Sequence, residues 1–212
     1  MKLHGYFRSS AAYRVRIALN LKGLTAEPAY LHLRKGEQAA PAYTALNPQK
    51  LVPTLEDEGA VLTQSLAIIE YLEERHPHPA LLPADPADRA RVRAIALAIA
   101  CEIHPLNNLR VLNHLRDRLG LDEAARNDWY RHWVSEGFAA VEAMLAGDPR
   151  TGRLCHGDTP TLADVVLVPQ VYNAERFAVD LAPYPAIRRI AQTARALDAF
   201  AAADPDRQPD AE

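Results

Sequence analysis

A proline-rich segment near residue 80 divides the chain into two stretches with different patterns. The segment reads His76-Pro77-His78-Pro79-Ala80-Leu81-Leu82-Pro83, and prolines at this density cannot continue a helix. Before it, short strand-like and helix-like runs alternate, whereas the sequence after it is rich in alanine and favours helices. The segment therefore predicts a linker between an α/β domain, residues 1–80, and an all-helical domain, residues 86–212.

The first stretch has the pattern of a β-α-β unit followed by a β-β-α unit. Apolar residues recur at helical spacing from Tyr13 onward, and Gly23 marks the end of that helix. A second helix begins at Ser65, directly after a predicted hairpin that turns at residues 57–59. The expected strands span residues 3–7, 29–33, 53–56 and 60–62. This order is typical of a thioredoxin-like domain.

Helix-capping residues divide the second stretch into four expected helices. Asp85-Pro86 fits an N-cap and a first-turn proline for a helix that runs towards Leu119 and bends near Pro105. Thr161 and Asp164 have the spacing of a capping box, in which each side chain bonds the backbone of the other residue. The remaining two helices are expected at residues 122–145 and 184–200.

Composition argues against several kinds of partner. A net charge of -3 and a pI near 6.2 disfavour nucleic acid, because nucleic-acid-binding proteins present a dense basic face. The two cysteines, Cys101 and Cys155, lack the spacing of a disulfide framework or a zinc site, and prolines around His76 and His78 disfavour a metal there. No apolar run is long enough to cross a bilayer, so we expect no membrane partner and a cytoplasmic location.

The first strand-to-helix turn carries two serines where a thioredoxin-like redox protein carries a nucleophilic cysteine. It reads Arg8-Ser9-Ser10-Ala11-Ala12, at a helix N-terminus where backbone amides and the helix dipole favour a bound anion. If sulfur chemistry takes place here, the sulfur must arrive on a ligand, and a serine hydroxyl can donate to its thiolate and lower its pKa. The alternative is that both serines only cap the helix.

A second candidate site surrounds the start of the helix at Ser65. The Ser65 hydroxyl and backbone N–H, together with the Gln64 amide, could hold a carboxylate such as the amino-acid end of a ligand. Val52-Pro53 is a candidate cis-proline turn, which would expose the Val52 backbone for strand-like pairing with a peptide. An ordinary helix cap and a trans turn are the alternatives.

Taken together, these segments resemble the zeta-class glutathione transferases. The segment Tyr6-Phe7-Arg8-Ser9-Ser10-Ala11-Ala12-Tyr13-Arg14-Val15-Arg16-Ile17-Ala18-Leu19 is similar to the class signature SSCxWRVRIAL. Further matches lie at Ala45-Leu46-Asn47-Pro48, Val52-Pro53-Thr54-Leu55, residues 64–74, Asn173-Ala174-Glu175-Arg176-Phe177 and Val179-Asp180-Leu181. The chain departs from the pattern where Ala11 replaces the usual cysteine and Tyr13 the usual tryptophan.

The resemblance implies a site for glutathione and for an acidic substrate. The implied glutathione contacts are Ser9, Ser10, Gln38, Val52, Gln64 and Ser65, with His104, Asn108 and Arg110 from the helical domain. The implied catalytic residues are Ser9 and Ser10, which face the thiolate, and Arg8 and Arg176, whose planar forks suit carboxylates. Without the resemblance, Arg8 is an exposed surface charge and Arg176 a helix-face salt bridge.

The activity implied by the resemblance is glutathione-dependent cis-trans isomerisation. A glutathione thiolate adds to a cis enone, the bond rotates, and elimination gives the trans isomer, as in conversion of maleylacetoacetate to fumarylacetoacetate in aromatic amino-acid catabolism. Isomerisation of maleylpyruvate in the gentisate pathway and general conjugation of glutathione to electrophiles remain alternatives, as does an inactive binding protein. The family also implies a homodimer.

Overall fold

The computed structural model describes all 212 residues, which form two compact units. Unit 1 comprises Met1–Ala80 together with Ala196–Glu212, and unit 2 comprises Leu81–Arg195. The break at residue 80 lies inside the proline-rich segment. Residues 196–212, which the sequence pattern placed with the helical domain, pack here with residues 1–80.

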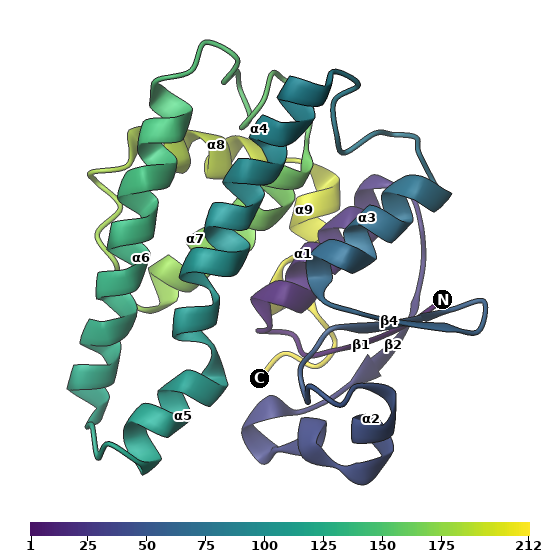
Figure 1. Cartoon of the computed structure of the whole chain (residues 1–212), viewed down its shortest axis with the longest axis vertical. Helices are drawn as coiled ribbons and strands as arrows, with labels where there is room; N and C mark the ends of the chain where they lie inside the picture. The colour runs from purple at the N-terminus through teal and green to yellow at the C-terminus, as the bar shows by residue number, and fades with distance from the viewer. The chain divides into compact units, whose positions relative to one another are not determined.

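Unit 1 is built on a four-stranded mixed sheet with the order β2-β1-β3-β4. β1 (Lys2–Gly5) pairs in parallel with β2 (Glu27–Tyr30) and antiparallel with β3 (Thr54–Asp57), which forms a hairpin with β4 (Ala60–Thr63). Helices α1 (Ser10–Leu21) and α3 (Ser65–Arg75) pack together on one face of the sheet, and α2 (Pro41–Leu46) lies on the other (Figure 1). The expected thioredoxin-like domain is confirmed.

The first two strands differ from the expected ranges. β1 ends at Gly5 because the chain turns at once: the Ser9 N–H donates to the Tyr6 carbonyl at 2.9 Å. Tyr6 and Phe7 instead join Tyr43 and Val52 in a buried cluster. β2 begins at Glu27 and ends at Tyr30, before the expected end at residue 33.

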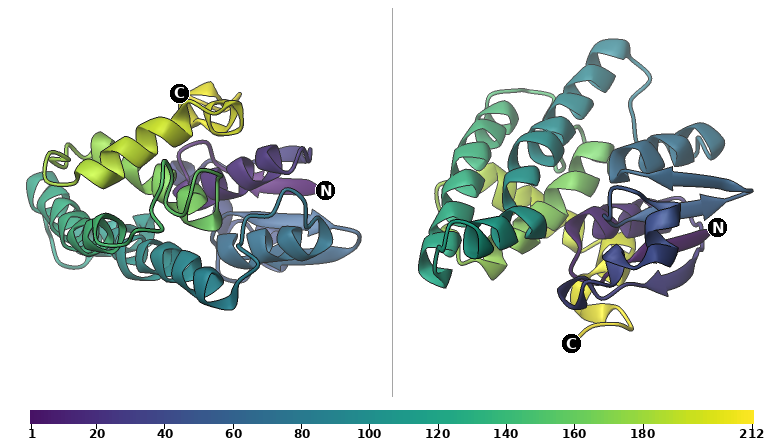
Figure 2. Two further views of the ribbon diagram at one scale, coloured as in Figure 1. Left: turned by 90° about the horizontal axis from the view of Figure 1, so that it is seen from above. Right: turned by 60° about the horizontal axis from the view of Figure 1, so that its bottom comes forward.

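A C-terminal segment completes unit 1 by packing on α1. Its helix α9 (Asp198–Ala203) contacts α1, and the segment lies beside that helix in both views of Figure 2. The Arg16 guanidinium donates to the carbonyls of Ala203 at 3.1 Å and Phe7 at 3.0 Å, and burial lowers the pKa of Arg16 to about 10. The single helix expected over residues 184–200 is therefore wrong: the chain makes two helices, with extended backbone at Leu197 between them.

Unit 2 consists of helices joined by loops and contains no strand. It contains α4 (Pro86–Leu97), α5 (Leu109–Asp117), α6 (Glu123–Ala146), α7 (Leu162–Arg176) and α8 (Pro185–Arg195), and none of the protein's helices is both long and apolar enough to span a membrane. The expected N-cap Asp85 is confirmed, since its carboxylate accepts the Ala87 and Asp88 N–H groups, and Asp122 caps α6 in the same way by accepting the Ala125 N–H.

The single helix expected from Pro86 to Leu119 is wrong, but the bend expected near Pro105 coincides with a true interruption of the helix. α4 passes into a π-helical turn, Ala98–Ile103, and then a 3-10 turn, Pro105–Asn107, before α5 begins. Pro105 lacks the N–H that would continue the helix, and Asn108 caps a new one. The π-helical turn packs closely against α6 at Gly137. A Cβ at that position would overlap the side chain of Ile103, the last residue of the turn.

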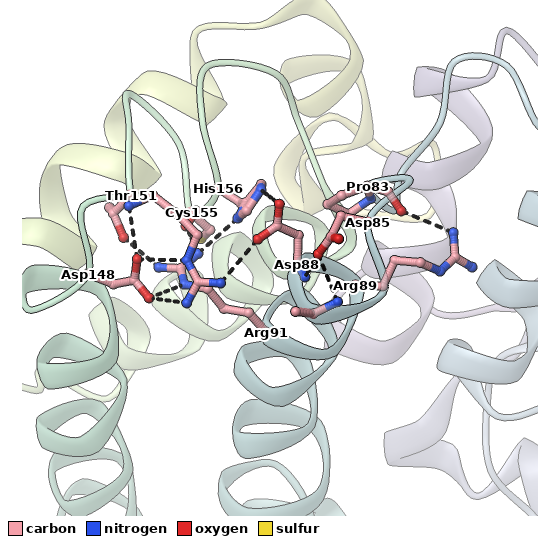
Figure 3. A network of polar contacts seen from close by, with 11 residues as sticks. Pro83, Asp85, Asp88, Arg89, Arg91, Asp148, Thr151, Cys155 and His156 are labelled. Atoms are coloured by element: carbon pink, nitrogen blue, oxygen red, sulfur yellow. Dashed lines mark hydrogen bonds and ion pairs between the residues drawn. The ribbon is translucent and has the colours of Figure 1, made fainter.

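Two buried polar groups hold the loop before α7. Asp164 accepts the Cys155 N–H, the Thr161 N–H and the Thr161 hydroxyl, each at 2.8 Å, so the expected capping box is present. Arg91 of α4 donates to Asp148 at 2.9 Å, to the Cys155 carbonyl at 2.8 Å and to Thr151 at 2.6 Å (Figure 3). These bonds fix the loop between α6 and α7 onto α4.

Candidate functional site

The serine turn at the start of α1 caps the helix and can also donate a hydrogen bond to a ligand. Ser9 is the N-cap: its Oγ accepts the Ala12 N–H at 3.2 Å and its carbonyl accepts the Tyr13 N–H at 2.8 Å. The capping alternative is thus realised at Ser9. A serine hydroxyl that accepts an N–H still has its own proton to donate, so capping leaves Ser9 able to stabilise a thiolate. Ser10, the first helical residue, is buried.

Arg8 lies in a cluster that binds a carboxylate. Its side chain is 25% exposed, its Nη2 lies 3.5 Å from the Glu212 carboxylate, and its guanidinium carbon lies 4.7 Å from the Phe7 ring centroid. His32 and Arg34 contact the same carboxylate, and the hydrogen bond from His32 is the main reason that the pKa of Glu212 is lowered. Arg8 is therefore more than an isolated surface charge.

Sequence reasoning missed the other members of this cluster. Arg8 and Glu212 stand at opposite ends of the printed sequence, and no motif joins either residue to His32. The segment that brings Glu212 close also places Asp210, whose carboxylate accepts the Phe7 N–H at 2.9 Å. Only the return of residues 196–212 to unit 1 assembles these groups.

A network around Asn47 shapes the loop that leads to Val52. Asn47 is buried, donates to the Leu51 carbonyl at 2.8 Å and accepts the Gln49 N–H at 3.0 Å. The Tyr43 hydroxyl donates to the same Leu51 carbonyl at 2.5 Å. The Val52–Pro53 peptide bond that follows is cis, as the sequence suggested.

The start of α3 lies next to this loop. The Gln64 amide donates to the Gln49 side chain at 2.8 Å, and Gln64 has φ +69°, a value uncommon for a residue other than glycine. The Gln64 side chain makes no capping bond to α3, so the first amides of the helix are not capped from that side chain. Ser65 is buried and accepts a hydrogen bond at 3.3 Å from Arg14 of α1.

Gln38 supplies an orphaned acceptor in unit 1. It lies in the 3-10 turn Glu37–Ala39, half-buried, and its Oε1 is buried without a hydrogen-bond partner in the protein. A buried acceptor without a partner is costly unless a ligand or water donates to it. Taken one by one, this acceptor, the Ser9 hydroxyl and the start of α3 match an N–H group, a thiolate and a carboxylate, which are functional groups of glutathione.

The remaining predicted residues belong to unit 2. His104 ends the π-helical turn, and Asn108 caps α5 by accepting the Arg110 N–H at 3.1 Å. Arg110 is exposed. Arg176 is the last residue of α7, also exposed, with its guanidinium carbon 5.5 Å from the Phe177 ring centroid and 5.9 Å from that of Tyr172.

The chemistry near Arg176 is set by aromatic rings and a neighbouring ion pair. Phe177 stacks on Tyr130 with ring centroids 3.6 Å apart, and burial raises the pKa of Tyr130, which stays neutral. The adjacent acid, Glu175, is bound by both terminal nitrogens of Arg195 at 2.8 Å. The ion pair at this end of α7 is thus made by Glu175 and Arg195 and not by Arg176, for which a helix-face salt bridge was the alternative.

The chain is similar to known proteins along its whole length. Residues 3–80 match the model of the glutathione S-transferase N-terminal domain. A maleylacetoacetate isomerase of Pseudomonas aeruginosa is 54% identical, with 99% of this chain and 98% of the relative covered. Among solved structures, the holo form of a maleylpyruvate isomerase described as a bacterial zeta-class glutathione S-transferase has a TM-score of 0.98 at 55% identity, with both chains fully covered. A maleylacetoacetate isomerase from Methylobacterium extorquens AM1, with bound malonate and glutathione, has a TM-score of 0.98 at 43% identity, again with both chains fully covered.

Proposed function

Because the chain belongs to the zeta-class glutathione transferases and is a glutathione-dependent cis-trans isomerase, we propose that it converts maleylacetoacetate to fumarylacetoacetate. This reaction belongs to aromatic amino-acid catabolism. The observation that carries the choice of an acidic substrate is the cluster of Arg8, His32 and Arg34, which already binds a carboxylate, that of Glu212. The malonate bound by one relative is also a small dicarboxylate, which supports the same choice.

Glutathione is the cofactor, and the residues of unit 1 fit its functional groups. The Ser65 hydroxyl, the first amides of α3 and the Gln64 amide would hold the carboxylate of the γ-glutamyl end. The Val52 backbone would pair with the cysteinyl residue, and the orphaned Gln38 Oε1 would accept a ligand N–H. Further contacts are assigned to Ser10 and, from unit 2, to His104, Asn108 and Arg110.

The residues of the chain do three things in the reaction. When bound, glutathione supplies a thiolate that adds to the double bond and later leaves it, so that the bond can turn while it is single. The Ser9 hydroxyl donates to that sulfur and, with the N-terminal dipole of α1, favours its ionised form at neutral pH. Arg8 and Arg176 bind the acidic ends of the substrate, because a guanidinium pairs with a carboxylate through two parallel bonds.

The two departures from the family signature leave this chemistry intact. The reacting thiol belongs to glutathione, so Ala11 removes a protein thiol but not the nucleophile. Tyr13, which replaces the usual tryptophan, is buried in unit 1, with the Arg16 guanidinium carbon 5.3 Å from its ring centroid. We therefore expect isomerase activity without a contribution from a cysteine at position 11.

A comparison of substrates tests the proposal. We expect turnover of maleylacetoacetate to require glutathione and to exceed turnover of maleylpyruvate in kcat/KM. Faster turnover of maleylpyruvate would favour the second candidate, which the 55% identity to a maleylpyruvate isomerase supports. Conjugation of a model electrophile such as chlorodinitrobenzene, without isomerisation of either acid, would indicate a general transferase and contradict the proposal.

We also propose an assembly and a compartment. The family resemblance implies a homodimer in which the α/β domain of one subunit pairs with the helical domain of the other. Both cysteines are free thiols, which fits a reducing compartment such as the cytoplasm.

A further inference from the structure

Arg14 is a buried arginine of α1 whose guanidinium reaches the first residue of α3. Its Nη1 donates to Ser65 Oγ at 3.3 Å, and the residue is only 2% exposed. A guanidinium has donors and no acceptor, so Ser65 Oγ must accept this bond. We propose that Arg14 is a positioning residue for the cofactor: it turns the Ser65 hydroxyl so that its proton points at the γ-glutamyl carboxylate of glutathione. This inference rests on the placement of glutathione at Ser65 given above.

The position of Ser65 in the helix explains why its hydroxyl needs a partner. Ser65 is the first residue of α3 and follows Gln64, whose side chain makes no capping bond. A serine at a helix start commonly turns its oxygen towards the backbone N–H groups of the next turn. Arg14 supplies a competing donor from behind the helix start, so the oxygen is engaged there and the single hydroxyl proton is left for a ligand.

The positive charge of Arg14 also favours a carboxylate at Ser65. Behind Ser65, the positive charge of the guanidinium stabilises an anion on the far side of the hydroxyl, where screening by water is weak. Position and charge together thus favour a carboxylate at Ser65.

Arg16 provides a comparison within the same helix. It is partly buried, and its guanidinium donates to two backbone carbonyls, those of Phe7 and Ala203. Those bonds tie the first turn of the chain to α9, which is a structural task. Arg14 and Arg16 are therefore matched in residue type and helix, although Arg16 is only partly buried, and they differ in whether the arginine reaches a ligand-binding hydroxyl.

A double-mutant cycle between Arg14→Met and Ser65→Ala tests the coupling. Calorimetry should show glutathione affinity reduced about tenfold or more in each single variant, the loss typical of a hydrogen bond to a charged group. The double variant should bind no more than about twofold more weakly than the weaker single variant, because both changes remove one interaction. Losses that multiply in the double variant would show that Arg14 acts independently of Ser65 and would overturn the proposal.

A glutathione analogue separates positioning from general damage to the fold. In 4-aminobutyryl-cysteinyl-glycine the γ-glutamyl carboxylate is missing, so Arg14→Met should bind this analogue as tightly as the parent protein does. The control Arg16→Met should lower the melting temperature while keeping the ratio of affinities for glutathione and analogue unchanged. Equal weakening of both ligands in Arg14→Met would overturn the role of Arg14.

Two further measurements keep the outcomes distinct. Arg14→Lys retains the charge and should recover part of the affinity; it also replaces Arg14→Met in the cycle if the methionine variant does not fold. If Ser65→Ala weakens binding and neither Arg14 variant does, the inference fails and the proposed function stands. If Ser65→Ala itself binds glutathione normally, the placement of the cofactor fails and the role of Arg14 fails with it.

Discussion

At the scale of single residues, Ser9 combines a cap and a potential catalytic donor. Its Oγ accepts the Ala12 N–H, which is a task any short polar side chain could perform, and its remaining proton is what a thiolate requires. The two roles use different parts of one hydroxyl. A substitution that keeps the helix cap but removes the proton can therefore separate them.

The Ser9→Ala variant should raise the pKa of the thiol of bound glutathione, by about one unit for the loss of one charge-assisted hydrogen bond. Between the two pKa values the parent holds mostly thiolate and the variant mostly thiol, so the absolute difference in activity between the two proteins is largest there. The difference shrinks as the pH rises above the pKa of the variant, because both proteins then hold the thiolate. Glutathione affinity should change little, because most contacts lie elsewhere. A thiolate absorbance titration of both proteins, saturated with glutathione, measures the shift.

Two companion variants complete this test. Ser9→Asp keeps a capping oxygen but, when ionised, has no proton to donate, so it should recover the stability lost in Ser9→Ala, about 1 kcal/mol, without restoring the thiol pKa. Ser10→Ala removes the neighbouring hydroxyl. If Ser9→Ala titrates like the parent and Ser10→Ala does not, Ser10 is the thiolate donor and Ser9 leaves the catalytic list.

Glu212 competes for the arginine that we assign to the substrate. Its carboxylate contacts Arg8, His32 and Arg34, and its lowered pKa keeps it ionised at neutral pH. We expect Glu212→Gln to lower KM for the acidic substrate about two- to fivefold, in line with the strength of an exposed ion pair, and the effect should fade at high salt. Steady-state kinetics at low and high ionic strength check it.

The control for this change is Glu58→Gln. Glu58 also pairs with an arginine, Arg75, at 2.6 Å, but at the hairpin between β3 and β4. Its removal should leave KM unchanged. A Glu212→Gln variant with the KM of the parent would show that Arg8 is not needed for the substrate or that Glu212 does not restrict it.

At the scale of elements, Lys22 fixes the end of α3 and the proline-rich segment to the end of α1. Its side chain is fully buried, and its Nζ donates to Glu73 at 2.7 Å, to the His76 carbonyl at 2.7 Å and to the Pro79 carbonyl at 3.0 Å. All three donor hydrogens of the ammonium group are thus used. The orphan carbonyls that follow α3 receive a charged donor rather than water.

Lys22→Met should lower the free energy of unfolding by about 3–5 kcal/mol, although methionine fills a similar volume. The variant removes the cation that pairs with the largely buried Glu73 carboxylate and the donor that the two carbonyls share. Urea denaturation followed by circular dichroism measures the loss. Lys35→Met, at an exposed position, should change stability by less than about 0.5 kcal/mol, and an equal effect of both variants would contradict the role of Lys22.

Helix starts could be predicted from sequence more accurately than helix ends. Asp85, Asp122 and Thr161 each cap the helix expected to follow, because a cap is a contact between residues two or three positions apart. The break after α4 has a local cause in Pro105 and the cap Asn108, and a distant one in Gly137 of α6, which leaves room for the Ile103 side chain of the π-helical turn. No local pattern reports a contact of that kind.

The same distinction holds at the candidate site. Ser9 and Ser65 could be found because they stand at helix starts within recognisable motifs. Arg14 lies within the signature, yet its bond to Ser65 depends on the packing of α1 against α3. His32 and Glu212 belong to no motif, and only the tertiary structure brings them to Arg8.

At the scale of the whole molecule, the proposed homodimer can be tested directly. We expect light scattering at micromolar concentration to give about twice the chain mass of 23.4 kDa, because interfaces of the implied kind bury more apolar surface than a monomer can expose. Dilution into the nanomolar range should leave the mass unchanged. A mass of one chain at micromolar concentration would contradict the proposal.

Because residues 196–212 pack with residues 1–80, the two units complete their folds in a fixed order during synthesis. Unit 2 is continuous in sequence, so it can reach its full set of internal contacts as soon as residue 195 has left the ribosome. Residues 1–80 are synthesised first but lack α9 and the partner carbonyl of Arg16 at Ala203 until residues 198–203 emerge. Unit 1 therefore completes its fold after unit 2, although residues 1–80 leave the ribosome first. These residues lack part of their packing throughout most of translation.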